Sequence, residues 1–254
     1  MIRIKSPAEI KLMQKAGEIA ELARRAAGEA VQPGITTREI AEIAGKVILA
    51  CGAKPSFLGY GGFEGIICVS INEEVIHGIP GRRKIKDGDM VKLDVGAYYG
   101  GYHGDCAATY FAGTAGEQAQ KLAQVTRQSF YEGIRYARAG GRVSDISHAI
   151  QTYCESLGYS LVRDYVGHGV GSELHEAPEV PNFGPPGRGP RLVPGMTLAI
   201  EPMVNAGGHE VRRLRDGWTV VTADGSLSGH YENTILITEG EPLILTADSG
   251  GKHE

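Results

Sequence analysis

Two acidic residues occupy matching places in a sequence that reads as duplicated. Asp94 ends the run GDMVKLD, and Glu201 ends the similar run GMTLAIE 107 residues later. The same offset relates Gly34 to Gly141. Carboxylates that converge inside a protein repel each other and are costly to desolvate unless a cation neutralises them. The pairing therefore predicts a metal centre between two related halves of the chain.

Three more residues could complete such a centre. Asp105 follows Asp94 across a glycine-rich turn, which predicts a hairpin with both carboxylates at one end. Glu232 forms a comparable pair with Glu201, and His168 lies between two glycines, where its ring has room to point at a ligand. Four carboxylates and one imidazole suit Mn²⁺, Fe²⁺ or Co²⁺, and also Zn²⁺ in a catalytic role. Because a single divalent ion needs fewer carboxylates, two bridged ions are the simplest interpretation.

Taken singly, each of these residues has a plainer explanation. A lone aspartate on a hairpin is most often a solvated surface residue, and His168 alone would more often be a hydrogen-bonded structural histidine. Two further histidines, His77 in VIHGIP and His175 in GSELH, are either surface loop residues or donors to a substrate carbonyl or oxyanion. The metal centre is predicted from the group and not from any one member.

Composition narrows the class of protein. With 254 residues, 42% of them hydrophobic and 22% charged, the chain is typical of a globular protein. A net charge of −4 gives no reason to expect nucleic-acid binding. No apolar run has the length of a membrane span, and the N-terminus does not read as a secretory signal. The four cysteines lack CxxC spacing, which indicates reduced thiols and a cytoplasmic location.

Capping residues, glycines and apolar spacing predict the order helix, helix, strands, repeated once. The predicted helices run over 6–33, 36–52, 114–140 and 144–158, and the strongest strands over 66–71, 90–95, 107–111, 197–201, 218–221 and 234–238. This order predicts an α+β fold with a curved, mostly antiparallel sheet inside and helices outside. We expect one catalytic domain, 1–254, built from related halves 1–112 and 113–248, with a long loop over 178–194 and a short loose tail at the C-terminus.

Six segments together resemble type I methionine aminopeptidases. They are NEEVIHGIP (72–80), DGD (87–89) before Asp94, GYHGD (101–105), GHGVG (167–171), EPMV (201–204) and YENT (231–234). The resemblance covers nearly the whole chain and implies the pita-bread fold, with its pseudo-twofold internal duplication. It also implies a metal-dependent hydrolase that removes the N-terminal methionine from newly made proteins and peptides, with a preference for a small second residue.

The resemblance implies a role for each predicted ligand. Asp94, Asp105 and Glu232 would hold one divalent ion, Co, Mn, Fe or Zn. Asp105 and Glu232 would bridge to a second ion, which His168 and Glu201 would complete. Glu201 would also move a proton from the nucleophile to the leaving amine.

Further contacts follow from the same resemblance. His77 and His175 match two substrate-facing histidines, which would stabilise the developing oxyanion. The methionine side chain would enter a pocket built with Tyr60, Phe63, Cys68 and Trp218. A monovalent cation site is implied near the backbone of Asn72, Glu74 and Ser228.

Three alternatives stay open. Other enzymes of this fold cleave X-Pro bonds, although they generally carry an additional N-terminal domain. A metal-free hydrolase or a non-catalytic peptide-binding module would be expected to lack at least one of the five ligand residues, and all five are present. The expected partners are nascent chains, with the ribosome as a candidate docking partner, and the resemblance favours a monomer.

Overall fold

The computed structural model describes residues 1–247, and the predicted C-terminal tail lies outside them. The helices are α1 (Pro7–Glu29), α2 (Thr37–Ala50), α3 (Glu117–Ile134), α4 (Val143–Ser156) and the short 3₁₀ helix η1 (Tyr60–Gly62). The strands are β1 (Lys54–Pro55), β2 (Cys68–Ile71), β3 (Glu74–Ile76), β4 (Met90–Tyr99), β5 (Tyr102–Phe111), β6 (Ser160–Leu161), β7 (Gly167–Gly169), β8 (Glu176–Val180), β9 (Thr197–Ile200), β10 (Met203–Asn205), β11 (Val211–Arg213), β12 (Val220–Thr222), β13 (Ser228–His230), β14 (Glu232–Leu236) and β15 (Leu243–Ile244).

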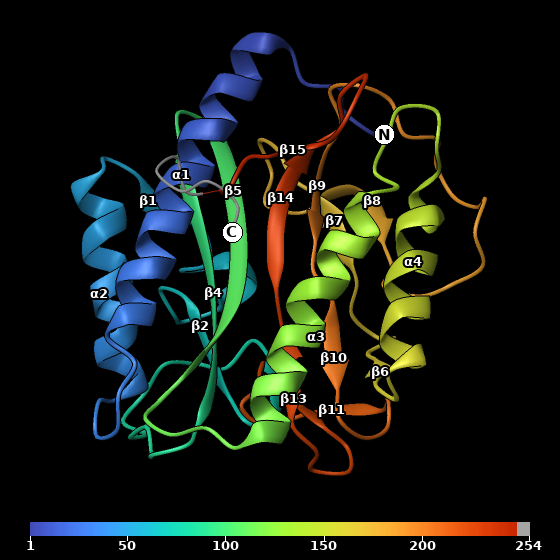
Figure 1. Ribbon diagram of the computed structural model, residues 1–254. Coiled ribbons are helices and arrows are strands. Elements are labelled where there is room, and N and C mark those ends of the chain that lie inside the picture. The colour runs from blue at the N-terminus through green and yellow to red at the C-terminus, as the bar shows by residue number, and fades with distance from the viewer. Residues whose placement is uncertain (248–254) are drawn as a thin grey trace.

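A nine-stranded sheet forms the centre of the structure (Figure 1). Its main path is β1-β4-β5-β14-β9-β7-β8, with β2 beside β4 and β15 beside β14. All of its strand pairs are antiparallel. The β5–β14 pair lies at the middle of the sheet, with β4 and β9 as its two outer neighbours. The predicted α+β fold is confirmed, whereas the boundary between halves at 112 and 113 stays a prediction.

Two hydrophobic clusters join the helices to the sheet. One packs α1 and α2 against the first strands, with Ile19, Ile40 and Leu93 among its members. The other packs α3 and α4 against the later strands. Figure 1 shows α1 and α3 crossing the front of the sheet, with α2 and α4 at its sides. None of the helices in the described part of the chain is long and apolar enough to cross a membrane.

The first two helices begin as the sequence predicts. The Ser6 and Glu9 side chains bond to each other's backbone N–H groups at the start of α1, and Thr36 and Glu39 do the same at α2. This reciprocal cap satisfies N–H groups that have no partner within the helix. Helix α1 is shorter than predicted, because it ends at Glu29 before the Pro-Gly turn.

The predicted starts of the other two helices are wrong. Helix α3 follows Gly116 without a side-chain cap, and the Thr114 N–H donates instead to Asp87 Oδ1 over 3.1 Å. Helix α4 begins before Ser144, whose hydroxyl accepts a hydrogen bond from the Arg188 backbone over 2.6 Å. In both cases a loop distant in sequence bonds to the residue that was expected to cap the helix, and local spacing could not reveal this contact.

The predicted loop over 178–194 is also partly wrong. Its first three residues belong to β8, the last strand on the main path of the nine-stranded sheet. A proline such as Pro178 cannot donate to a strand pair, but at a sheet edge it need not do so. The strand predicted over 218–221 begins only at Val220, because the backbone N–H groups of Trp218 and Thr219 both bond to Asp216.

Close contact between α1 and β5 depends on the absence of a side chain at Gly104. A Cβ atom on Gly104 would lie 2.4 Å from the backbone nitrogen of Gly17. We expect Gly104→Ala to lower the free energy of unfolding by ~1–3 kcal/mol, because backbone atoms would have to separate. Urea unfolding measures this loss. The control is Gly81→Ala, whose Cβ would meet no atom closer than 4.0 Å; equal losses in both variants would contradict the packing argument.

Candidate metal centre

Neighbouring strands bring the predicted ligands together. Ala107 on β5 is the register partner of both Asp94 on β4 and Glu232 on β14. Asp105 precedes Ala107 by two residues and therefore points to the same face of the sheet. The sheet thus presents three acids from three adjacent strands at one level.

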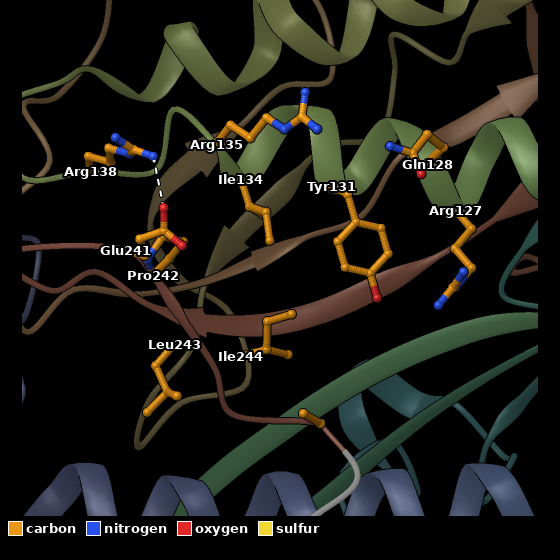
Figure 2. A pocket seen from close by; sticks show the side chains of 11 residues that line it. Arg127, Gln128, Tyr131, Ile134, Arg135, Arg138, Glu241, Pro242, Leu243 and Ile244 are labelled. Atoms are coloured by element: carbon orange, nitrogen blue, oxygen red, sulfur yellow. Dashed lines mark hydrogen bonds and ion pairs between the residues drawn. The ribbon is translucent and has the colours of Figure 1, made fainter. Parts of the chain in front are cut away.

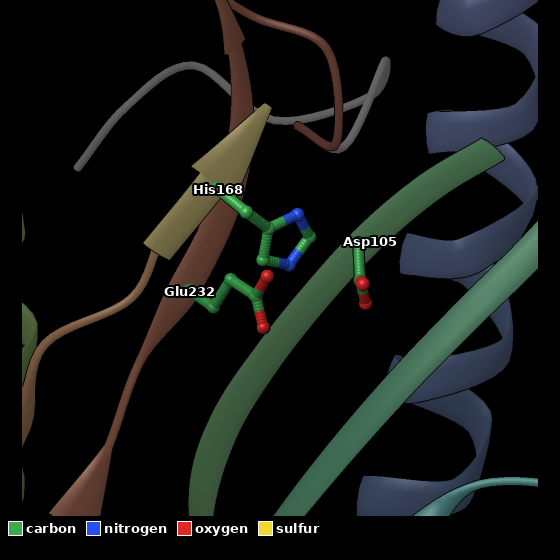
Figure 3. A group of neighbouring side chains, drawn as sticks. All are labelled: Asp105, His168 and Glu232. Carbon is green, nitrogen blue, oxygen red and sulfur yellow. The ribbon is translucent and has the colours of Figure 1, made fainter. Parts of the chain in front are cut away.

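The other half of the sheet repeats this arrangement. Ala199 on β9 is the register partner of both His168 on β7 and Thr234 on β14. Glu201 follows Ala199 by two residues, just after β9 ends, and Glu232 precedes Thr234 by two. Strand alternation therefore directs the second pair of ligands toward the first. Figure 3 shows His168 and Glu232 side by side, with Asp105 facing them from β5.

All residues predicted for the site line one cavity of about 320 Å³. They are Tyr60, Phe63, Cys68, His77, Asp94, Asp105, His168, His175, Glu201, Trp218 and Glu232. The cavity also includes apolar residues outside the predicted set, such as Phe57, which lies in a stretch with no motif to mark it, and Ile76, which lies within the NEEVIHGIP segment. Its apolar part is a cluster of Phe57, Phe63, Cys68 and Leu174, against which Ile79 and Trp218 pack.

A larger cavity, of about 530 Å³, lies elsewhere. It lies between α3 and the segment 241–247, and Figure 2 shows Arg127 and Tyr131 on the helix, with Arg138 beyond its end. The Arg138 guanidinium already pairs with Glu241 at 3.1 Å. None of the predicted ligands reaches this cavity, so the chemistry belongs to the smaller one.

Burial makes the four acids difficult to ionise. Asp105 and Glu232 are each 3% exposed. Burial raises the pKa of Asp94 to about 7. It also raises the pKa of Asp105, Glu201 and Glu232 well above their usual range, and the charges of the neighbouring acids add to this shift. A cation is the partner that would allow all four to ionise together.

Unpaired acceptor atoms show that a cation fits. Within residues 1–247, buried oxygen atoms of Asp94, Asp105 and Glu232 have no hydrogen-bond partner. His168 Nδ1 donates to the Gly169 carbonyl over 2.9 Å, and burial lowers the pKa of the ring to about 3. The lone pair of His168 therefore lies on Nε2, which is 3.4 Å from a carboxylate oxygen of Glu201, and His168 forms a ligand group with Asp105 and Glu232. These donors suit a divalent ion.

His230 is a functional candidate that the sequence analysis missed. It is 1% exposed, and Nε2 lies 3.9 Å from an oxygen of Glu201 and 3.9 Å from an oxygen of Glu232. Neither ring nitrogen has a hydrogen-bond partner in the described chain. Burial lowers its pKa to about 3, so the ring is neutral. Its position two residues before Glu232 is a signal that could have identified it, because alternate residues of an extended chain share a face.

The two candidate ion positions share one acid. Asp105, His168 and Glu232 form one group of possible ligands, and Glu201, His230 and Glu232 form the other. Glu232 belongs to both groups and therefore lies where a bridging carboxylate is needed. Asp94 lines the same cavity but joins neither group.

His175 contacts both the candidate ligands and the cavity wall. Its Nδ1 lies 2.8 Å from the Tyr60 hydroxyl, and its ring centroid lies 4.0 Å from that of His168. Burial lowers its pKa. With the hydroxyl donating to Nδ1, the Nε2–H of a neutral His175 is free to donate to a ligand.

His77 is held in an unusual backbone conformation. Its φ is +60°, a value that non-glycine residues adopt at a cost. The next residue, Gly78, bonds through its carbonyl to the Val69 N–H over 2.9 Å, which fixes the turn. The His77 ring meets those of Tyr165 and Trp218 edge-on, with centroids 5.8 and 6.2 Å away. Such strain is typical of a functional position.

Known proteins are similar to this chain in sequence and fold. Residues 11–239 match the model of metallopeptidase family M24. The chain is 54% identical over 246 residues to methionine aminopeptidase 1 of Bacillus subtilis (strain 168), with 97% of this chain and 99% of that protein covered. The crystal structure of methionine aminopeptidase from Thermotoga maritima superposes with a TM-score of 0.96 at 48% identity, covering 98% of this chain and 100% of that one.

A more distant relative shares the fold. The prolidase from Pyrococcus furiosus superposes with a TM-score of 0.79 at 26% identity, covering 97% of this chain and 66% of that one. These likenesses confirm the pita-bread fold that the resemblance implied. Membership of a metallopeptidase family, together with the buried ligand groups, indicates the use of divalent metal. The chain belongs to metallopeptidase family M24, alongside its methionine aminopeptidases.

Proposed function

We propose that this protein is an aminopeptidase that removes N-terminal methionine by metal-dependent hydrolysis of the first peptide bond. The observation that carries the proposal is a single cavity with buried carboxylates and neutral imidazoles beside an apolar aromatic wall. The polar part suits divalent cations, and the apolar part suits an unbranched thioether side chain. Relatives named methionine aminopeptidase over almost their whole length support it.

Two divalent ions, Co, Mn, Fe or Zn, form part of the proposal. Asp94, Asp105 and Glu232 would hold one ion. Asp105 and Glu232 would also be ligands of a second ion, whose ligand set His168 and Glu201 would complete. Divalent ions in such a centre supply an activated water and polarise the peptide carbonyl. The protein's own contribution is to hold these carboxylates rigidly on adjacent strands.

Glu201 is the proposed proton carrier. One carboxylate oxygen lies 3.4 Å from His168 Nε2, and the other lies 3.9 Å from His230 Nε2. A carboxylate fixed between two neutral imidazoles can accept the proton of the attacking water and release it to the leaving amine. Its backbone carbonyl accepts a hydrogen bond from Asn182 over 3.0 Å, which fixes the segment.

Two histidines would bind the peptide. His175, oriented by Tyr60, would donate from Nε2 to the carbonyl oxygen as negative charge develops there. His77, whose ring packs edge-on against Trp218, would also donate to the peptide. The pocket of Tyr60, Phe63, Cys68 and Trp218 would exclude water from the methionine side chain, and its apolar surface would favour that side chain.

The cellular part of the proposal follows from the resemblance. Substrates would be newly made chains whose second residue is small, and the protein would act as a monomer in the cytoplasm, with the ribosome as a candidate docking partner. The proposal does not include a dissolved monovalent cation near Asn72. The carbonyl oxygen of Asn72 already accepts hydrogen bonds from Lys92 Nζ over 2.7 Å and from the Ser228 N–H over 3.1 Å.

Release of free methionine tests the function. Chelator-stripped protein is titrated with Mn²⁺, Fe²⁺ or Co²⁺ and given the peptide Met-Gly-Met-Met. We expect metal-dependent release of the first methionine. Glu232→Gln should lower turnover by more than the ~100-fold that loss of an outer partner costs, because it removes a shared ligand. Cleavage of an X-Pro peptide without N-terminal methionine would favour a prolidase-like activity. Metal binding without any turnover would favour a binding module.

The metal-free protein should lose stability as pH rises above about 6.5. The pKa of Asp94 is raised to about 7, and those of the other three acids are raised well above their usual range, so the folded state keeps protons that the unfolded chain releases. Below pH 6.5 the neutral His168 and His230, with pKa values lowered to about 3, act in the opposite direction. Their contribution ends once the unfolded chain also deprotonates at 6.5. Above pH 7, Lys92 also acts in the opposite direction, because its pKa is lowered to about 7, but its single proton is outnumbered by those of the four acids.

Thermal unfolding between pH 6.5 and 8.5, with and without Mn²⁺, checks this sign. The midpoint should fall with pH in the metal-free protein and should rise on adding metal, because the ion replaces the bound protons. A midpoint independent of pH in the metal-free protein would show that the four acids do not carry the predicted protons.

His230→Ala should weaken divalent metal binding by roughly 10–100-fold, the usual cost of losing a partner behind the ligands. We expect the imidazole to hold the outer oxygens of Glu201 and Glu232, which lie equally far from Nε2. His230→Gln, which keeps an N–H donor, is the matched control and should lose less. Calorimetric titration with Mn²⁺ measures both. Unchanged affinity in the alanine variant would remove His230 from the centre.

A further inference from the structure

Lys92 is a buried lysine that the proposed chemistry does not use. It lies on β4 two residues before Asp94, and it is 1% exposed. Lysine is almost never fully buried unless it is paired, because its ammonium loses its hydration. Its side chain does not line the 320 Å³ cavity. We therefore expect the Lys92 ammonium to have a structural role outside the cavity.

The Lys92 ammonium lies under a tight turn that offers it oxygen. Nζ donates over 2.7 Å to the backbone carbonyl of Asn72, a residue held at a φ of +55°. Burial lowers the pKa of Lys92 to about 7, while the negative charge of Glu74 acts in the opposite direction. The Glu74 carboxylate is itself fixed, since one oxygen accepts from the Ile71 N–H and the other from Arg83, each over 2.7 Å.

This turn is the meeting point of three parts of the site. It joins β2, which carries Cys68, to β3, which leads directly to the strained His77. The Asn72 carbonyl also accepts the N–H of Ser228 on β13, and β13 runs on to His230 and then to Glu232. Lys92 thus links the strand of Asp94, the hairpin of His77 and the strand before Glu232 through one carbonyl oxygen.

We propose that the Lys92 ammonium is a built-in monovalent cation that positions the His77 hairpin against β13, so that the protein needs no dissolved cation at this turn. Lys92 is a positioning residue, because it acts on the cavity through Asn72 and is not among the residues that line it. The effect on turnover rests on the proposed function, whereas the effect on stability does not.

Replacement of the ammonium by a dissolved cation tests this role. Lys92→Ala opens a space beside the Asn72 carbonyl and Glu74, which small cations can enter and tetramethylammonium cannot. At constant ionic strength, the thermal midpoint of the metal-free variant should rise with the concentration of Na⁺, K⁺ or NH₄⁺, as it does for a ligand of the native state. Methionine release should fall about tenfold in tetramethylammonium, as for loss of an outer partner, and recover in K⁺.

Two further proteins complete the experiment. The wild type should show the same midpoint and turnover in K⁺ and in tetramethylammonium. Lys92→Met fills the space without a charge, so it should fold, keep its metal content and lose kcat, and no cation should restore it. It also carries the test if Lys92→Ala does not fold.

Three results would overturn the proposal. They are a wild type that depends on small cations, a Lys92→Met variant with wild-type turnover, and a Lys92→Ala variant that behaves alike in K⁺ and tetramethylammonium. Because the thermal midpoints are measured without peptide, they decide the question even if the protein releases no methionine. A cation-specific midpoint in Lys92→Ala with no turnover in any protein would reject only the proposed function.

Discussion

The mutual repulsion of four largely buried carboxylates is the constraint on which the rest of this structure depends. Asp105, Glu201 and Glu232 are only 3–12% exposed and lie on or just beyond adjacent strands. They cannot all ionise without a cation. A flexible scaffold would let them move apart into water. The antiparallel sheet prevents this, because each acid is attached to a strand whose two neighbours fix its register.

The strand register of the sheet brings the ligands from the two halves of the chain to one level. Ala107 aligns Asp94 with Glu232, and Ala199 aligns His168 with the strand that carries Glu232. Each half of the fold therefore delivers its ligands to the same level, from opposite sides of the β5–β14 pair. Helix α1 can cover this pair closely because glycine replaces larger residues where helix and strand backbones meet.

The histidines around the centre stay neutral because they are buried. Burial lowers the pKa of His77, His168 and His230, which leaves ring nitrogens able to accept a cation or donate to a carbonyl. The most deeply buried lysine of residues 1–247, Lys92, donates from its ammonium to the Asn72 carbonyl and does not line the cavity. Negative charge thus faces the cavity, and the protein's own positive charge supports the turn behind it.

The sequence by itself determined which residues form the candidate centre, the α+β class and the caps of the first two helices, because motifs, glycines and local spacing are properties of neighbouring residues. It also marked all the pocket residues that were predicted, through the resemblance. Only the tertiary structure decided the start of α3, the use of Pro178 in an edge strand, and the roles suggested for His230 and Lys92. Those features depend on contacts between segments far apart in the chain, such as Thr114 with Asp87, and local spacing carries no information about such contacts.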